Sequence, residues 1–201
     1  GPRKVVELVA AGAIGGPLSF IYHSGQYLPD WHPWEDYRTY YVSRRITGAC
    51  REIVPFELSW LCQAFGDVAS VSAFRGKVSD LDADIDDLYQ CLLGFASGVQ
   101  GFLQVDVLAR APVRHFRLLG ALGTLEWEAA RNEVRVYSAK TDQWATHPLP
   151  HGTVEKDYAE WATEEPYIEE MRDFLAAVRG ERPFGYTYEE DCWPLRVLGA
   201  A

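Results

Sequence analysis

The 201-residue chain lacks several features that would each point to a class of protein. No apolar run approaches the ~20 residues of a membrane-spanning helix, so we expect no membrane partner. Positive charge is scarce. The formal net charge of −10 disfavours nucleic-acid binding, which needs Lys and Arg facing phosphates. A strand–G-x-G-x-x-G–helix unit is also missing, which excludes a dinucleotide-binding loop of that kind.

Metal-binding patterns are missing as well. The chain has four cysteines without a C-x-x-C pair or a metal-ligand spacing: Cys50, Cys62, Cys91 and Cys192. The acidic run 80–87 imitates a calcium loop for three positions, but Ile85 stands where Gly is needed and Cys91 where a bidentate Glu is needed. We therefore predict a solvated turn at 80–87 and no metal site. The thiols resemble reduced cytosolic cysteines, so we expect a cytoplasmic protein.

The chain is rich in apolar and aromatic residues. Hydrophobic residues make up 48%, with seven Trp and eleven Tyr, so disorder is not expected. A chain of this length can bury roughly 70% of its unfolded surface in one core. We expect residues 1–201 to form a single domain.

The stretch 47–65 predicts an amphipathic helix that follows a glycine-containing loop. Its apolar stripe is predicted to lie on the core and comprises Ile53, Phe56, Trp60, Leu61 and Ala64. Because Pro is tolerated in the first helical turn, Pro55 puts Arg51 and Glu52 at or just before the helix N-terminus. The helix dipole stabilises a carboxylate there, so Glu52 either caps the helix or serves a site beyond it.

Elsewhere the pattern predicts a sheet flanked by helices. Apolar and polar residues alternate from Val68 onward, for example over 103–107 and 134–136, and the connectors are short. Short connectors force antiparallel neighbours. Helices are predicted at 3–11, after Pro166 and from the Thr187–Glu190 capping box, and 141–163 is interpreted as a polar connector. The fold class is therefore α+β, with a large, mostly antiparallel open sheet and helices packed on one face.

The segment 27–46 is a Pro-broken loop dense in Trp, Tyr, His and Arg. Aromatic faces with a few polar tips suit a sugar ring, and loops on a rigid scaffold often carry binding groups. The candidates are His32, Trp34, Tyr37 and Arg38. The alternative is an aromatic lid that packs on the domain's own core.

Several stretches together resemble the C-terminal domain of the Gfo/Idh/MocA family, the relatives of glucose–fructose oxidoreductase and inositol dehydrogenase. The resemblance depends on their order and spacing over nearly the whole chain, and the stretches are 8–18, 48–66, 94–101, 118–126 and 179–183.

That resemblance implies the substrate-binding and oligomerisation domain of an oxidoreductase that uses NAD or NADP on a sugar, cyclitol or related polyol. It implies that the cofactor is bound by an N-terminal Rossmann domain, which is absent from this chain. It also implies a homo-oligomer, such as a dimer, formed through the sheet face. Arg51 would lie in the substrate site with the four loop residues.

One departure from the family pattern concerns the chemistry. Members commonly place an Asp and, four residues later, a His at the start of the central helix, where the pair moves the substrate hydroxyl proton. Those positions are Glu52 and Phe56 here. Glu52 can still accept a proton, whereas Phe56 cannot transfer one. Either His32, Tyr37 or Glu57 replaces the histidine, or the common dehydrogenation does not occur.

Two other hypotheses remain open. In one, the chain is a non-catalytic module whose sheet face dimerises or binds a partner, with aromatic area from Phe74, Phe95, Phe102, Phe116, Trp127, Tyr137 and Trp144. Alternatively, these side chains fill the core beneath the helices. In the other hypothesis, Glu52 and Glu57 perform lyase or isomerase chemistry without a nicotinamide.

Overall fold

The structure is a computed structural model that describes residues 1–150 and 165–201. Four α-helices and eight strands are present in the described part. In chain order they are α1 (Pro2–Ala10), β1 (Pro17–Gly25), α2 (Cys50–Phe65), β2 (Val68–Gly76), β3 (Leu88–Phe95), β4 (Gln100–Asp106), β5 (Val113–Gly120), β6 (Gly123–Glu128), β7 (Glu133–Ser138), β8 (Gln143–Pro148), α3 (Glu165–Val178) and α4 (Tyr188–Ala200). Among these residues no helix is long and apolar enough to cross a membrane.

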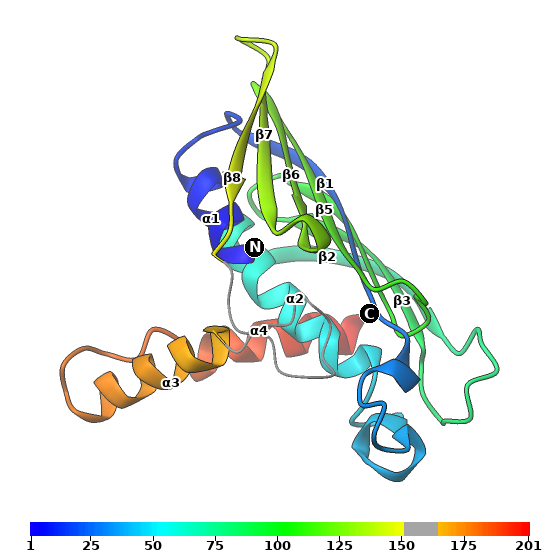
Figure 1. Cartoon of the computed structure of the whole chain (residues 1–201). Helices are drawn as coiled ribbons and strands as arrows, with labels where there is room; N and C mark the ends of the chain where they lie inside the picture. Colours follow the sequence, from blue (N-terminus) through cyan, green and yellow to red (C-terminus); the bar gives the residue numbers. More distant parts are fainter. Residues whose placement is uncertain (151–164) are drawn as a thin grey trace.

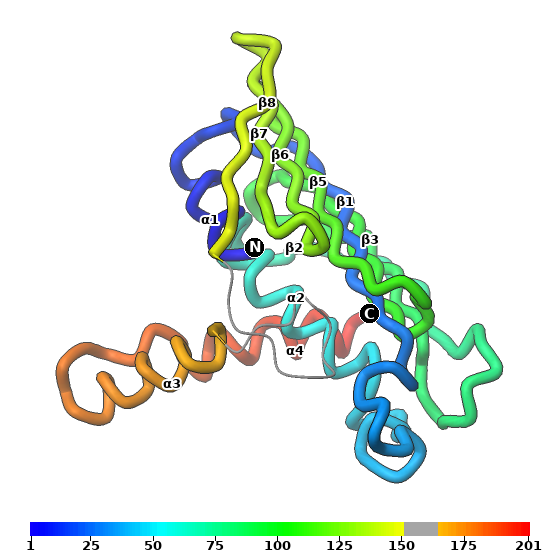
Figure 2. Tube along the Cα trace, viewed as in Figure 1, coloured from blue at the N-terminus to red at the C-terminus, as the bar shows by residue number. Residues whose placement is uncertain are grey.

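All eight strands belong to one open sheet in the order β2-β3-β4-β1-β5-β6-β7-β8 (Figure 1). Strand β1 is inserted between two meanders, where it pairs parallel with β4 and antiparallel with β5. Figure 2 shows the blue trace of β1 among the green strands from the middle of the chain. Every other neighbouring pair is antiparallel, so the predicted α+β class and mostly antiparallel sheet are confirmed.

Helices α1, α2 and α4 cover one face of the sheet, with α2 packed against both other helices (Figure 1). The core lies between α2 and the sheet, and its centre is aromatic. Phe20 stacks on Phe65 at 5.4 Å, and Tyr22 meets Trp60 edge to face at 5.4 Å. This core fixes α2, and therefore the loop that precedes it, against the sheet.

The predicted buried stripe of α2 is confirmed for Trp60 and Leu61 but wrong for Phe56. Phe56 is 67% exposed and Ile53 is only partly buried. The buried residues instead run along a neighbouring stripe: Cys50, Val54, Glu57, Leu58, Trp60, Leu61 and Phe65. Pro55 lies in the second turn rather than the first, because the helix begins at Cys50. A residue in the second turn normally donates its N–H to the carbonyl four residues earlier. Proline has no N–H, so the Arg51 carbonyl does not receive this hydrogen bond.

Two further expectations need correction. Strand β8 lies inside 141–163, which was predicted to be a polar connector. None of its residues is buried, so the strand has no apolar face and an alternating pattern cannot reveal it. The part of that connector from residue 151 onward lies outside the described residues. The aromatic residues proposed for a sheet-face interface do not all lie on one surface. Phe95, Phe116 and Trp127 are core residues, whereas Phe74 is 54% exposed.

Candidate functional site

The loop before α2 is forced into an unusual conformation. A Cβ on Gly48 would lie 2.3 Å from the backbone of Val42, so only glycine fits this close approach. Ala49 follows with φ 57° and ψ −132°, a left-handed conformation that an L-residue adopts at a cost. Strain of this kind is often found at functional sites. It sets the direction in which Cys50, Arg51 and Glu52 leave the loop.

Glu52 occupies the first turn of α2 and is held by the loop segment 27–46, which we call the aromatic loop. The hydroxyl of Tyr41 donates a hydrogen bond of 2.9 Å to Glu52 Oε1. The other oxygen, Glu52 Oε2, is buried without a hydrogen-bond partner in the described part of the chain, and so is the hydroxyl of Tyr40. Leaving a buried polar atom unpaired costs about 1–3 kcal/mol, so both atoms favour a further polar partner.

The imidazole of His32 lies within a stack of aromatic rings in this loop. Its ring stacks between Trp34, at 5.2 Å, and Tyr40, at 5.6 Å, with interplanar angles of 18° in both cases. Tyr40 in turn meets Tyr41 edge to face at 5.8 Å. The rings of Trp34, His32, Tyr40 and Tyr41 thus contact one another in that order, and the Tyr41 hydroxyl binds Glu52.

The two tyrosines remain protonated over the ordinary pH range. Burial, together with the hydrogen bond to Glu52, raises the pKa of Tyr41 to about 12. Burial and the nearby charges of Glu35 and Glu52 raise the pKa of Tyr40. Each phenol is therefore a hydrogen-bond donor next to a carboxylate acceptor, not a base.

Arg51 and Phe56 flank the same helix end. Arg51 donates from Nε to the carbonyl of Ile46 at 3.2 Å, which ties the helix to the loop. Phe56 lies one turn after Glu52, so its exposed ring lies on the same side of α2. The histidine position of the family pattern is therefore a surface phenyl ring.

Tyr37 and Arg38 are directed elsewhere. The guanidinium of Arg38 pairs with Asp36 at 2.7 Å and with Asp82 at 3.4 Å, and the Tyr37 hydroxyl accepts from the backbone N–H of Asp82 at 3.2 Å. These contacts join the aromatic loop to the acidic turn 80–87. The predicted solvated turn is thus partly an anchoring segment, and Arg45 adds ion pairs to Asp84 and Asp86.

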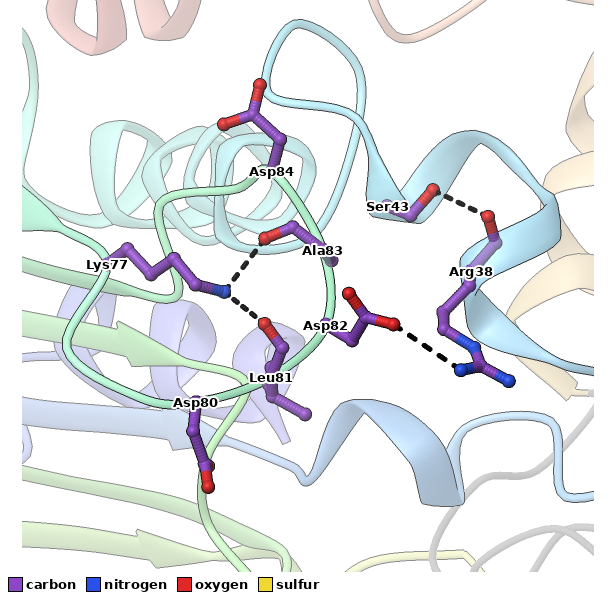
Figure 3. Close-up of a pocket in the computed structure, with 8 residues that line it drawn as sticks. All are labelled: Arg38, Ser43, Lys77, Asp80, Leu81, Asp82, Ala83 and Asp84. Carbon is purple, nitrogen blue, oxygen red and sulfur yellow. Dashed lines mark hydrogen bonds and ion pairs between the residues drawn. The ribbon is translucent and has the colours of Figure 1, made fainter.

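A cavity of about 810 Å³ lies at this junction (Figure 3). In Figure 3 the ammonium group of Lys77 points at the carbonyls of Leu81 and Ala83, and Arg38 points at Asp82. Two of its acidic groups are paired with arginines, Asp82 with Arg38 and Asp84 with Arg45. In the described residues no three acidic, histidine or cysteine side chains gather as metal ligands.

Glu57 is not available for proton transfer to a ligand. It is 1% exposed and accepts four hydrogen bonds, which come from Tyr22, Ser24, Trp60 and Arg114 at 2.7–2.9 Å. A carboxylate with this many donors connects α2 to β1 and β5. Its role is to hold the helix on the sheet.

The structure therefore brings together Glu52, His32 and Trp34 and directs Tyr37 and Arg38 to the acidic turn. Tyr40 and Tyr41 complete the group. Sequence reasoning placed them in the loop without choosing them, because nothing in the sequence indicates which tyrosines face α2. The group offers one carboxylate acceptor, phenol donors and flat aromatic faces, which together can bind a hydroxylated ring.

Comparison with solved structures finds the same fold in several oxidoreductases. A levoglucosan dehydrogenase in complex with NADH and levoglucosan has a TM-score of 0.75 at 18% identity, over 98% of this chain and 58% of that one. An oxidoreductase from Agrobacterium radiobacter in complex with NAD+, L-tartaric acid and magnesium has a TM-score of 0.82 at 14% identity, over 100% and 58%. An oxidoreductase domain protein from Kribbella flavida has a TM-score of 0.78 at 18% identity, over 99% and 59%.

This chain thus spans less than two thirds of the length of these solved relatives. A search of curated protein sequences finds no match. The GFO/IDH/MocA C-terminal domain profile matches residues 3–126, which is more than half of the chain, includes β1, α2 and β2 to β5, and ends inside β6. This protein belongs to the GFO/IDH/MocA C-terminal domain family.

Proposed function

We propose that this chain is the substrate-binding and oligomerisation domain of an NAD(P)-dependent oxidoreductase that acts on a sugar, cyclitol or related polyol. The observation that carries the proposal is the group at the start of α2. The carboxylate of Glu52 is held by Tyr41 and faces the aromatic rings of the loop, with one of its oxygens still unpaired.

In this proposal a substrate hydroxyl donates to Glu52 Oε2 and accepts from the Tyr40 hydroxyl. Both atoms are covered in the structure, so their side chains must move apart when the substrate binds. The ring of Trp34, which is 57% exposed and stacks on His32, supplies a flat surface for the C–H face of the substrate. Glu52 is the group that accepts the proton of the substrate hydroxyl, because the phenyl ring of Phe56 cannot bind a proton.

We propose that the described residues of this chain do not hold the cofactor. In the described sheet β1 and β4 are the one parallel pair, and no glycine-rich strand-to-helix turn joins parallel strands into a phosphate cradle. We propose that a separate nucleotide-binding domain holds NAD or NADP and accepts the hydride. The family relatives whose structures contain NADH support this proposal.

Saturation-transfer NMR on the chain with D-glucose, myo-inositol and xylitol tests the binding site. We expect signals from at least one probe, a several-fold loss in Glu52→Gln, and no loss in Glu7→Gln, an exposed glutamate on α1. Calorimetry with NADH and NADPH on the protein that includes its nucleotide-binding domain tests the cofactor. Absence of binding to both would overturn the oxidoreductase proposal.

The second role, oligomerisation, is supported by the outer face of the sheet. Leu92, Phe102 and Ile21 lie side by side across β3, β4 and β1, and they line a shallow depression of about 410 Å³. Leu92 is 59% and Ile21 is 61% exposed, and a contiguous apolar row of this kind marks an association surface. We propose that a second copy covers it. Sedimentation should show a dimer at micromolar concentration and a monomer for Ile21→Glu.

A further inference from the structure

Strand β2 forms one edge of the sheet and pairs with β3 alone. Apart from β3, no described residue makes a backbone–backbone hydrogen bond with residues 69–75. An open edge is a template for another strand, and proteins usually block it with Lys, with Pro or by keeping the strand very short. Strand β2 is nine residues long and contains neither Lys nor Pro, whereas β8 at the opposite edge has six residues and ends at Pro148. The edge of β2 therefore favours pairing with a further strand.

A bulge is another device that blocks an edge, and β2 contains one near its start. The register with β3 shifts between Val68 and Ser70. From Ser70 to Gly76 the residues pair one for one with Gly94 to Leu88 of β3. The longer part of β2 is therefore regular, and the bulge does not prevent a second strand from pairing with it.

The sequence of β2 is almost the same in both directions. Residues 68–74 read V-A-S-V-S-A-F, so the alanines and serines are placed symmetrically about Val71. Opposite charges flank this segment at equal distances, because Asp67 lies four residues before Val71 and Arg75 four residues after it. Both side chains are exposed, and neither forms an ion pair with another described residue. In a two-fold interface residue i contacts residue j and j contacts i, so a symmetric strand fits a second copy of itself.

We propose that two copies of this chain pair their β2 edges antiparallel across a two-fold axis at Val71, which joins their sheets into one continuous sheet. Val71 then lies opposite Val71 of the second copy, and Ser70 lies opposite Ser72. Asp67 of each copy lies at the same end as Arg75 of the other, so the flanking charges attract. A shift of two residues would place Ser70 opposite Phe74, so the symmetric register is favoured.

This interface is separate from the sheet-face association, because it uses the backbone edge of β2 rather than the outer face of the sheet. It is also smaller. A nine-residue strand is about 30 Å long and a sheet is about 10 Å thick, so each copy buries on the order of 300 Å². A stable complex between separate chains needs about 800 Å² per partner. We therefore expect edge pairing at submillimolar protein concentration, well above the micromolar range in which the sheet faces associate.

Disulfide trapping tests the register, in a Cys192→Ser background that removes the exposed native thiol. Directly opposite residues of antiparallel strands have Cα atoms about 4.5–5.5 Å apart, which a disulfide can bridge. Val71→Cys should therefore form a covalent dimer during copper-catalysed oxidation at submillimolar concentration. Ser72→Cys is the matched control. Its two copies are diagonal neighbours about 7–8 Å apart, so it should cross-link at least tenfold more slowly.

Exchange of the flanking charges tests the two-fold symmetry. Arg75→Asp brings like charges together and should slow the cross-linking of Val71→Cys several-fold, and the further change Asp67→Arg should restore it. Sedimentation gives a second measurement without any new cysteine. Ile21→Glu, which removes the sheet-face contact, should pass from monomer to dimer as its concentration rises to submillimolar, and Arg75→Asp should weaken that dimer.

Equal cross-linking of Val71→Cys and Ser72→Cys would overturn the inference, because it indicates random collision. Absence of cross-linking in Val71→Cys would overturn it too, since the edge is then either free or covered by another segment. A monomer of Ile21→Glu at every concentration, or no restoration by the charge exchange, would have the same consequence. Each of these results leaves polyol and cofactor binding untouched, so the inference and the proposed function fail independently.

Discussion

The hydroxyl of Tyr41 lies 2.9 Å from Glu52 Oε1, and this hydrogen bond connects the aromatic loop to the carboxylate in the first turn of α2. Tyr41 follows Tyr40, whose ring stacks on His32. The position of the carboxylate therefore depends on the folding of the loop as well as on the helix. The properties of the site should change when either partner of the bond is changed.

The first prediction concerns alkaline pH. The pKa of Tyr41 is raised from 10.0 to about 12, so the folded state keeps its phenol protonated where the unfolded chain has lost the proton. The stabilising contribution is therefore complete below pH 10 and is lost as pH rises towards 12. Urea unfolding across this range should show a shallower decline for Tyr41→Phe. An identical decline in both proteins would contradict the assignment.

A second prediction concerns the exposed Phe56. Because its ring is 67% exposed, Phe56→His should change the free energy of unfolding by less than about 0.5 kcal/mol. The new imidazole would stand one turn from Glu52, where it can exchange the substrate proton. In the polypeptide that carries the nucleotide-binding domain, we expect polyol oxidation at least tenfold faster than in Phe56→Gln. Equal rates would show that Glu52 does not orient a group at this position.

The difference between the predicted and observed faces of α2 has a physical cause. Apolar residues occur almost all round this helix, so two neighbouring stripes both fit helical spacing. Tertiary contacts select the observed stripe, because Glu57 bonds to Tyr22 and Phe65 stacks on Phe20. Similarly, alternation predicted several strands but not β8, and the insertion of β1 between β4 and β5 depends on long-range pairing that no local pattern reveals.

Local signals, in contrast, were reliable where the cause is local. The capping box at Thr187 is confirmed, since its hydroxyl accepts from the N–H of Glu190 and the Glu190 side chain accepts from the N–H of Thr187. At the site, the sequence predicted that the aromatic loop matters. It could not predict that Arg38 turns to Asp82 while Tyr41 turns to Glu52, because both choices depend on how the loop folds.

The third prediction concerns the buried carboxylate of Glu57. Glu57→Ala removes an acceptor shared by Tyr22, Ser24, Trp60 and Arg114, and should destabilise the fold by about 3–5 kcal/mol. Glu57→Gln keeps the shape and should cost less. Denaturant unfolding measures both, with Glu126→Ala on β6 as a control whose side chain makes only a 3.5 Å ion pair. If Glu57→Ala lowers the free energy of unfolding no more than the control does, the four hydrogen bonds to Glu57 do not stabilise the fold as proposed.

The fourth prediction compares two neighbouring loop residues. Gly48→Ala places a methyl group 2.3 Å from the Val42 backbone, so the loop must shift and stability should fall by about 2 kcal/mol or more. Ala49→Gly relieves the positive φ and should raise stability by roughly 0.5–1 kcal/mol. Thermal unfolding of both variants distinguishes them. Destabilisation by both would mean that the Ala49 methyl group contributes more by packing than it costs in strain.

Asp106, at the end of β4, leads to the last prediction. Burial alone would raise its pKa, but hydrogen bonds from His23, Gln104 and the Leu108 N–H outweigh burial and hold the pKa below 3.8. A lowered pKa means that the unfolded chain takes up the proton first as pH falls. The stabilisation is therefore present above about pH 4 and is lost below it.

We expect the melting temperature of the wild-type chain to fall more steeply than that of Asp106→Asn between about pH 5 and pH 3. At neutral pH the variant should be the less stable protein, because its amide cannot accept all of these donors at once. His23→Ala provides the control, since it removes one donor and leaves the Gln104 and Leu108 bonds. It should show an intermediate slope, and a slope equal to that of Asp106→Asn would assign the whole effect to the imidazole.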